Sequence, residues 1–134
     1  MMKQAASVRK RPRLWGVTVL TSLDDADLRA QGVSRSVSEQ VTYLAEQASK
    51  AGLDGVIASG SDVKAIKQAV GHEFTVVTPG MRLEVSADDQ KRALTPWDAR
   101  RNGADFFVIG RPVLEAKDPE KVVKEIYEKI EAKV

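Results

Sequence analysis

Short apolar runs alternate along the chain with longer stretches in which apolar residues recur at helical spacing. The runs lie at residues 14–19, 54–58, 74–77 and 106–109, and they are rich in β-branched or aromatic residues. Each run is followed by turn residues and then by a helical stretch, so the pattern predicts four βα units and a parallel sheet. Because the runs are apolar at successive positions rather than at alternate ones, we expect strands that are buried on both faces.

Capping signals mark where the helices begin and end. Ser36 with Glu39 three residues later forms a capping-box pattern, and the apolar face that follows it ends at Gly52. Other helix starts combine a cap residue with a proline or a short apolar stripe; they are Ser59 or Ser61 (ending at Gly71), Thr95-Pro96 and Asp118-Pro119. A further short helix is expected at residues 112–116.

Composition narrows the classes of function. The 134 residues suffice for one domain. The absence of cysteine excludes disulfide scaffolds, thiolate metal sites and thiol catalysis. No apolar run is long enough to span a bilayer, and the N-terminus does not have the pattern of a signal peptide, so we expect a cytoplasmic protein.

The positive charge is concentrated at the N-terminus. Residues 1–13 carry five basic side chains and no acid; since the net charge is +2, the rest of the chain sums to −3. Such a basic arm could bind nucleic acid through its phosphates. No aromatic residue is interleaved with the charges, which favours a solvated helix end over a nucleic-acid partner.

Glycine and arginine follow two of the predicted strands at the point where each strand ends. These are the segments Gly80-Met81-Arg82 and Gly110-Arg111, with Gln90 in the loop between them. Glycine lets the backbone approach a ligand closely, and arginine can bind an anion with two N–H groups. In a (β/α)8 barrel the last two strand ends often form a phosphate site, sometimes with a short helix. The alternative interpretation is two turn glycines with ordinary surface arginines, and a flavodoxin-like sheet also fits the pattern of elements.

Other polar residues are weaker candidates. His72 follows a predicted helix end, and the acidic cluster at residues 24–27 is more typical of a helix start than of a metal site, so no metal site is predicted. The run from Asp62 to Lys67 has an Asp-x-Lys start, but we expect it inside a helix facing solvent and assign it no catalytic role.

Several motifs together resemble bacterial orotidine 5'-monophosphate decarboxylase. They are Val17-Thr18-Val19-Leu20-Thr21-Ser22, Gly52-Leu53-Asp54-Gly55-Val56, Val77-Thr78-Pro79-Gly80-Met81-Arg82, Asp89-Gln90-Lys91-Arg92, Thr95-Pro96 and Val108-Ile109-Gly110-Arg111-Pro112. The resemblance implies an α/β fold of the (β/α)8 TIM-barrel type, of which only the C-terminal four βα units are present. Residues 1–13 would then be a basic remnant of a barrel helix, and residues 14–134 a half barrel with phosphate-binding loops.

The same resemblance implies roles for five residues. Thr21 would lie at the pyrimidine end of the site, Arg82 in a closing loop, and Gln90, Gly110 and Arg111 at the 5'-phosphate. The sequence departs from the family at Leu83, where proline is common, and its loop from Arg82 to Gln90 is about one residue shorter. These departures affect the closing loop and remove no phosphate ligand.

The resemblance also shows what is missing. In the family a lysine–aspartate array, mostly from an Asp-x-Lys-x-x-Asp segment, converts orotidine 5'-monophosphate (OMP) to UMP and CO2 without a cofactor. No such segment follows any strand here, so no catalytic residue is predicted and the chain alone is expected to be inactive. An OMP- or UMP-like nucleotide is the expected ligand. Runs 14–19 and 106–109 would leave open strand edges, which predicts a homo-oligomer or a complementary N-terminal half barrel as partner. A non-catalytic nucleotide binder and an engineered, self-assembling half-barrel fragment are the alternatives.

Overall fold

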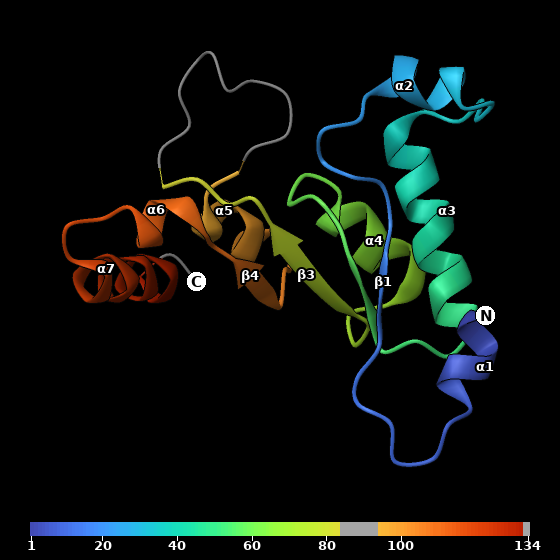
Figure 1. Cartoon of the computed structure of the whole chain (residues 1–134), viewed down its shortest axis with the longest axis horizontal. Helices are drawn as coiled ribbons and strands as arrows, with labels where there is room; N and C mark the ends of the chain where they lie inside the picture. Colours follow the sequence, from blue (N-terminus) through green and yellow to red (C-terminus); the bar gives the residue numbers. More distant parts are fainter. Residues whose placement is uncertain (84–93, 133–134) are drawn as a thin grey trace.

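The computed structural model describes residues 1–83 and 94–132 and contains one parallel sheet with helices around it (Figure 1). The strands are β1 (Trp15–Val17), β2 (Gly55–Ile57), β3 (Thr75–Pro79) and β4 (Phe106–Val108). The helices are α1 (Met2–Ala6), α2 (Asp25–Ala30), α3 (Val37–Lys50), α4 (Val63–Val70), α5 (Pro96–Arg101), α6 (Arg111–Leu114) and α7 (Pro119–Glu131). Helices α1 and α7 lie on opposite sides of the sheet in this view.

The sheet has the strands and the order that the sequence predicts. Its strand order is β1-β2-β3-β4, and each neighbouring pair is parallel. Each of the first three strands is therefore followed by a helical crossover to the next strand, which is the repeat of a (β/α) barrel. Within the described residues β1 and β4 are the edge strands, as predicted.

The predicted helix starts are confirmed with one exception. Ser36 and Glu39 form a reciprocal capping box, and the side chains of Thr95 and Asp118 accept backbone hydrogen bonds at the starts of α5 and α7. The prediction for α4 was wrong. Its N-cap is Asp62, whose side chain makes no capping bond to the helix, while the hydroxyls of Ser59 and Ser61 lie 3.1 Å apart and bond each other.

One face of the sheet packs against the helices and carries the core. Val41 of α3, Val56 of β2 and Ile66 of α4 are at most 1% exposed and belong to one cluster. Gly55 lets β2 and β3 lie close together, because a Cβ atom there would lie 2.2 Å from the carbonyl oxygen of Thr75 on β3.

The opposite face of the sheet is largely uncovered, so the prediction of strands buried on both faces was wrong for the two edge strands. Trp15 and Val17 of β1 are 39% and 61% exposed, and Phe106 and Val108 of β4 are 47% and 53% exposed. In a complete barrel this face would point to the interior, where side chains from the other strands would cover it. The apolar pattern of these strands thus fits a barrel of which the chain supplies one part.

The basic N-terminal segment is only partly helical. Helix α1 ends at Ala6, and the residues from Pro12 to Leu14 lead into β1 without regular structure. Among residues 1–83 and 94–132, no helix combines the length and apolar character needed to cross a membrane.

Candidate functional site

The ends of β3 and β4 bring the two predicted glycine–arginine segments to one edge of the sheet. The strands are parallel, and their register places Pro79 beside Val108. Gly80 therefore follows β3 at the same end at which Gly110 follows β4. This arrangement is the one that a shared anion site requires, because in a parallel barrel the carboxyl ends of the strands form a single rim.

The segment after β3 is anchored at its base. Gly80 adopts a φ of +72°, a left-handed conformation that glycine tolerates well, and it turns the chain out of the strand. Met81 then packs into the core with 3% exposure. The backbone N–H of Arg82 donates to the carbonyl oxygen of Leu94 at 3.4 Å, so the two sides of the loop meet at this point. Arg82 is consequently fixed at the rim, with a partly buried side chain.

The segment after β4 presents its arginine to solvent. Gly110 is the N-cap residue of α6, and a Cβ atom at this position would meet no other atom within 4 Å, so the space beside its backbone is open. Arg111 is exposed and makes no ion pair with any residue in the described parts of the chain. The short helix that was predicted at residues 112–116 lies at Arg111–Leu114. A free guanidinium beside an open backbone is suited to a phosphate group.

Two of the predicted site residues are not part of this pair of segments. Thr21 lies in an exposed turn after β1, at the same end of the sheet but on its far edge, two strands from β3. Gln90 lies outside the described residues.

The rim also includes the segment Ser59-Gly60, of which the sequence predicted only a helix cap at Ser59. Ser59 and Gly60 follow β2 and are buried. A Cβ atom on Gly60 would lie 3.2–3.3 Å from side-chain atoms of Leu94, Ala99 and Thr78, and the Gly60 carbonyl accepts a hydrogen bond from Asn102 at 3.1 Å. The signal in the sequence was a glycine between two serines directly after a strand. Its tight packing supports the rim between β2 and β3.

Charged pairs lie at the other end of the sheet, before the strands begin. Asp54 precedes β2 and accepts hydrogen bonds from Arg11 at 2.5 Å and from the backbone N–H of Leu14 at 2.7 Å. The Arg11 hydrogen bond, and after it the Leu14 N–H, hold the pKa of Asp54 below its usual value. These contacts fix the N-terminal segment to the start of the sheet.

Lys67 forms a second polar cluster at this end. Its ammonium group donates to the carbonyl oxygens of His72 and Phe74 and to the carboxylate of Asp105, at 2.8–2.9 Å. The same carboxylate oxygen of Asp105 accepts from the backbone N–H of Val76 at 2.7 Å. Since all three ammonium hydrogens have acceptors, Lys67 serves structure rather than chemistry.

The expectation that the Asp62–Lys67 run faces solvent was wrong at both ends. Asp62 is 5% exposed and Lys67 is 4% exposed, whereas Lys64 between them is exposed on α4. His72 is exposed just after Gly71, the C-cap residue of α4. No group of three or more potential metal ligands occurs among the residues that the structure describes.

Comparison with known proteins agrees with this architecture. Residues 1–126 match the family model described as orotidine 5'-phosphate decarboxylase / HUMPS family. The chain belongs to this orotidine 5'-phosphate decarboxylase / HUMPS family. It is 50% identical over 116 residues to the orotidine 5'-phosphate decarboxylase of Legionella pneumophila (strain Corby), an alignment that covers 86% of this chain and 51% of the relative.

Solved structures show the same relation to the decarboxylase family. The orotidine 5'-phosphate decarboxylase of Lactobacillus acidophilus superimposes with a TM-score of 0.75 and 37% identity, over 89% of this chain and 49% of the other. An uncharacterized conserved protein from Geobacillus kaustophilus superimposes with a TM-score of 0.74 and 34% identity, over 92% of this chain and 51% of the other. The chain thus spans about half the length of the relatives it matches and corresponds to the C-terminal half of the family's TIM-type barrel.

Proposed function

We propose that this chain is the nucleotide-binding half of an orotidine 5'-phosphate decarboxylase and that it grips the 5'-phosphate of OMP or UMP. The observation that carries the proposal is the exposed, unpaired Arg111 beside Gly110, on the same rim as Gly80 and Arg82. Family membership supports a phosphorylated nucleotide as the ligand. Thr21, by the same resemblance, is proposed for the pyrimidine end and Gln90 for the phosphate.

The chain alone does not carry the proposed chemistry. Loss of CO2 from OMP leaves a carbanion, which needs a positioned acid to protonate it. None of the strands is followed by the Asp-x-Lys-x-x-Asp segment that supplies the acid in the family. Phosphate binding contributes remote binding energy, which helps only when the reacting groups are also present. We therefore propose an inactive half that needs a barrel-completing partner, and we assign it to the cytoplasm.

The proposed phosphate contact is tested by calorimetric titration of the chain with UMP. Replacing Arg111 with alanine removes a charge-assisted hydrogen bond of about 1.5–3 kcal/mol. The dissociation constant for UMP should then rise by roughly 10- to 150-fold. Arg29→Ala on α2 is the matched control, because Arg29 is also exposed but lies on a helix away from the β3–β4 rim, and it should leave the affinity unchanged.

Uridine provides the ligand control, since it lacks only the phosphate and should bind far more weakly than UMP. If UMP gives no heat, or if Arg111→Ala and Arg29→Ala bind it equally well, the phosphate role of this rim is wrong. If the chain binds UMP but no added N-terminal half barrel restores turnover of OMP, the second candidate function, a non-catalytic nucleotide binder, is favoured.

A further inference from the structure

The sheet is curved, and its uncovered face, which carries exposed apolar side chains, is the concave one. Strands lie about 4.8 Å apart, so side chains three strands apart would be separated by roughly 14 Å on a flat sheet. Trp15 of β1 and Phe106 of β4 nevertheless have ring centroids 5.9 Å apart. The two edge strands therefore bend toward each other on this face, and the exposed apolar residues line the inside of the bend.

The same edge residues leave backbone groups open. On β1, Leu14 and Thr18 bond to the β2 side, through Asp54 N–H to Leu14 O and through Thr18 N–H to Ile57 O. Backbone direction alternates along a strand, so the N–H and C=O groups of Trp15 and Val17 point to the free edge. On β4, the N–H of Asp105 bonds to Val76 O on β3.

By the same alternation, Phe106 and Val108 direct their backbone groups to the free edge of β4. Each edge strand thus has the same two features: backbone N–H and C=O groups directed to the free edge, and apolar side chains on the uncovered face of the sheet. An edge of this kind is a template for pairing with another strand.

The exposed area leaves room for a stable interface. The whole chain exposes 8830 Å², whereas a compact monomer of 14.7 kDa would expose about 6,900 Å². Part of this excess of about 1,900 Å² comes from the open sheet face and its edges, and an interface of standard size needs only about 800 Å² from each copy.

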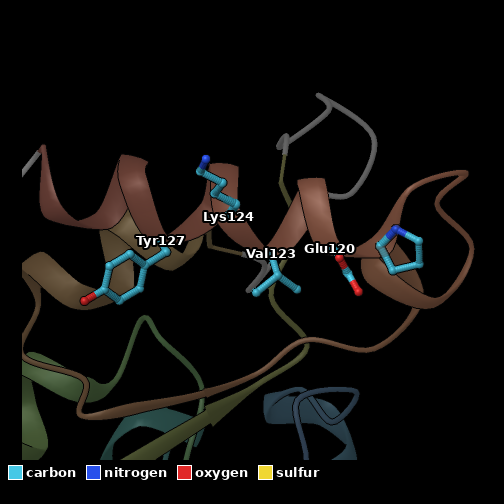
Figure 2. A pocket seen from close by; sticks show the side chains of 5 residues that line it. Glu120, Val123, Lys124 and Tyr127 are labelled. Carbon is cyan, nitrogen blue, oxygen red and sulfur yellow. The ribbon is translucent and has the colours of Figure 1, made fainter.

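Helix α7 adds an apolar stripe at the β4 side of this surface. Val123 and Tyr127 are 51% and 62% exposed, one helical turn apart, and Figure 2 shows them pointing to the same side of the helix. They line a shallow groove together with Pro119, Glu120 and Lys124. In a (β/α) barrel, the helix that follows a strand packs over the seam to the next strand. No strand follows β4 in the described residues, and the stripe is exposed there.

We propose that two copies of this chain close a symmetric eight-stranded barrel, with β4 of each copy beside β1 of the other. All four strands are parallel. A twofold rotation about the barrel axis, which runs along the strands, therefore places β4 of each copy beside β1 of the other and leaves no free strand edge. Pairing β1 with β1 would leave both β4 edges open. This inference rests on the open half barrel of the proposed function; the second copy closes the barrel but does not supply the Asp-x-Lys-x-x-Asp segment.

Sedimentation of the chain at about 10 μM tests the stoichiometry, in the range where obligate dimers persist. The expected mass is twice 14.7 kDa. Val108→Lys puts a charge on the inner face and should give a monomer, whereas Tyr43→Lys, at an exposed aromatic on α3, should stay dimeric. A monomeric parent chain overturns the proposal, including one that assembles only with an added N-terminal half barrel.

Cross-linking tests the seam itself and does not depend on the charged variant folding. The chain has no cysteine, so Val17→Cys and Val108→Cys can be purified separately, mixed and oxidised. The mixture should give a disulfide-linked dimer far more efficiently than either variant alone. Lys64→Cys, exposed on α4, replaces one partner as the control and should not cross-link.

Efficient linking of Val17→Cys to itself would overturn the proposed pairing. The outcome is separable from that of the nucleotide proposal. A cross-linked dimer that ignores UMP contradicts only the phosphate site, and a monomer that binds UMP contradicts only the closed pair.

Discussion

Thr78 shows how one residue can be well packed and still poorly satisfied. It is fully buried on β3, and its hydroxyl has no hydrogen-bond partner in the described structure. Its methyl group packs toward Gly60, where a Cβ atom would lie 3.3 Å away. A buried hydroxyl without a partner loses its hydration and gains nothing in exchange. Thr18, which directly follows β1, is the contrasting case, because its hydroxyl donates to the carbonyl oxygen of Ile57 at 2.9 Å.

Thr78→Val should therefore stabilise the protein, by about 1 kcal/mol, because valine keeps the shape and removes the unsatisfied hydroxyl. Thr18→Val is the matched control and should destabilise by about 0.5–1.5 kcal/mol, since it removes a hydrogen bond and leaves a carbonyl with one partner fewer. Urea denaturation of both variants measures the changes. A loss of stability in Thr78→Val would mean that the hydroxyl is satisfied in solution.

At the scale of elements, the N-terminal segment is tied to the sheet through side chains far apart in sequence. Arg11 contacts Asp54 and the carbonyl oxygens of Ala6 and Gly52, and thereby connects α1 to the turn that precedes β2. Leu14 N–H, which donates to the same carboxylate, sets where β1 begins. This segment was predicted only as a solvated basic helix end, because the partner of Arg11 lies 43 positions away.

The Arg11–Asp54 pair predicts a pH dependence. The pKa of Asp54 is lower in the folded chain than its usual value, so the pair stabilises the fold above about pH 4. That contribution is lost as the pH falls through the lowered pKa. Arg11→Ala should reduce stability at pH 7, and its difference from the parent chain should shrink below about pH 4.

Urea midpoints between neutral and acidic pH measure this difference. Arg9→Ala is the control, because Arg9 carries the same charge in the same segment and is exposed. It should give a curve parallel to that of the parent. A difference for Arg11→Ala that stays constant down to the acid transition would assign the effect to packing instead of to the ion pair.

At the scale of the whole molecule, the chain is one half of a barrel whose inner face and two strand edges are open. The rim at the carboxyl ends of the strands carries the unpaired arginine, and the opposite ends carry the ion pairs. This division would separate the proposed nucleotide binding from stability within one small domain, as in complete barrels. Neither copy of the proposed pair carries the Asp-x-Lys-x-x-Asp segment, so catalysis requires the other half of the family's barrel.

Complementation measures whether catalysis can be restored. The half of the Legionella pneumophila relative that this chain does not match is, by the family resemblance, expected to carry the Asp-x-Lys-x-x-Asp segment. A fragment of that half, mixed with this chain, should convert OMP to UMP with release of CO2. Each fragment alone should be inactive, and changing the lysine of that segment to alanine should abolish turnover in the mixture. A heterodimer that forms but turns over no OMP would contradict the proposal that this chain retains a working nucleotide-binding half.

Part of the candidate site could be recognised from residues alone. Gly80 with Arg82, and Gly110 with Arg111, stand directly after apolar runs, and the structure places both segments at one edge of neighbouring strands. The supporting segment at Ser59 was mistaken for a cap because a serine before a helix fits both roles. The positions of the ion pairs were not predictable, since charges on separate elements meet only after the elements pack.

The sequence by itself determined the local order of this protein: four strands, the helix starts at Ser36, Thr95 and Asp118, and the order of elements. These features depend on neighbouring residues, which are present in the chain as it is read. Only the tertiary structure decided which face of the sheet is covered and that the apolar side chains of Trp15 and Phe106 meet across an open one. An apolar run indicates a strand that is stable only when it is buried. Whether it is buried depends on which other elements cover it.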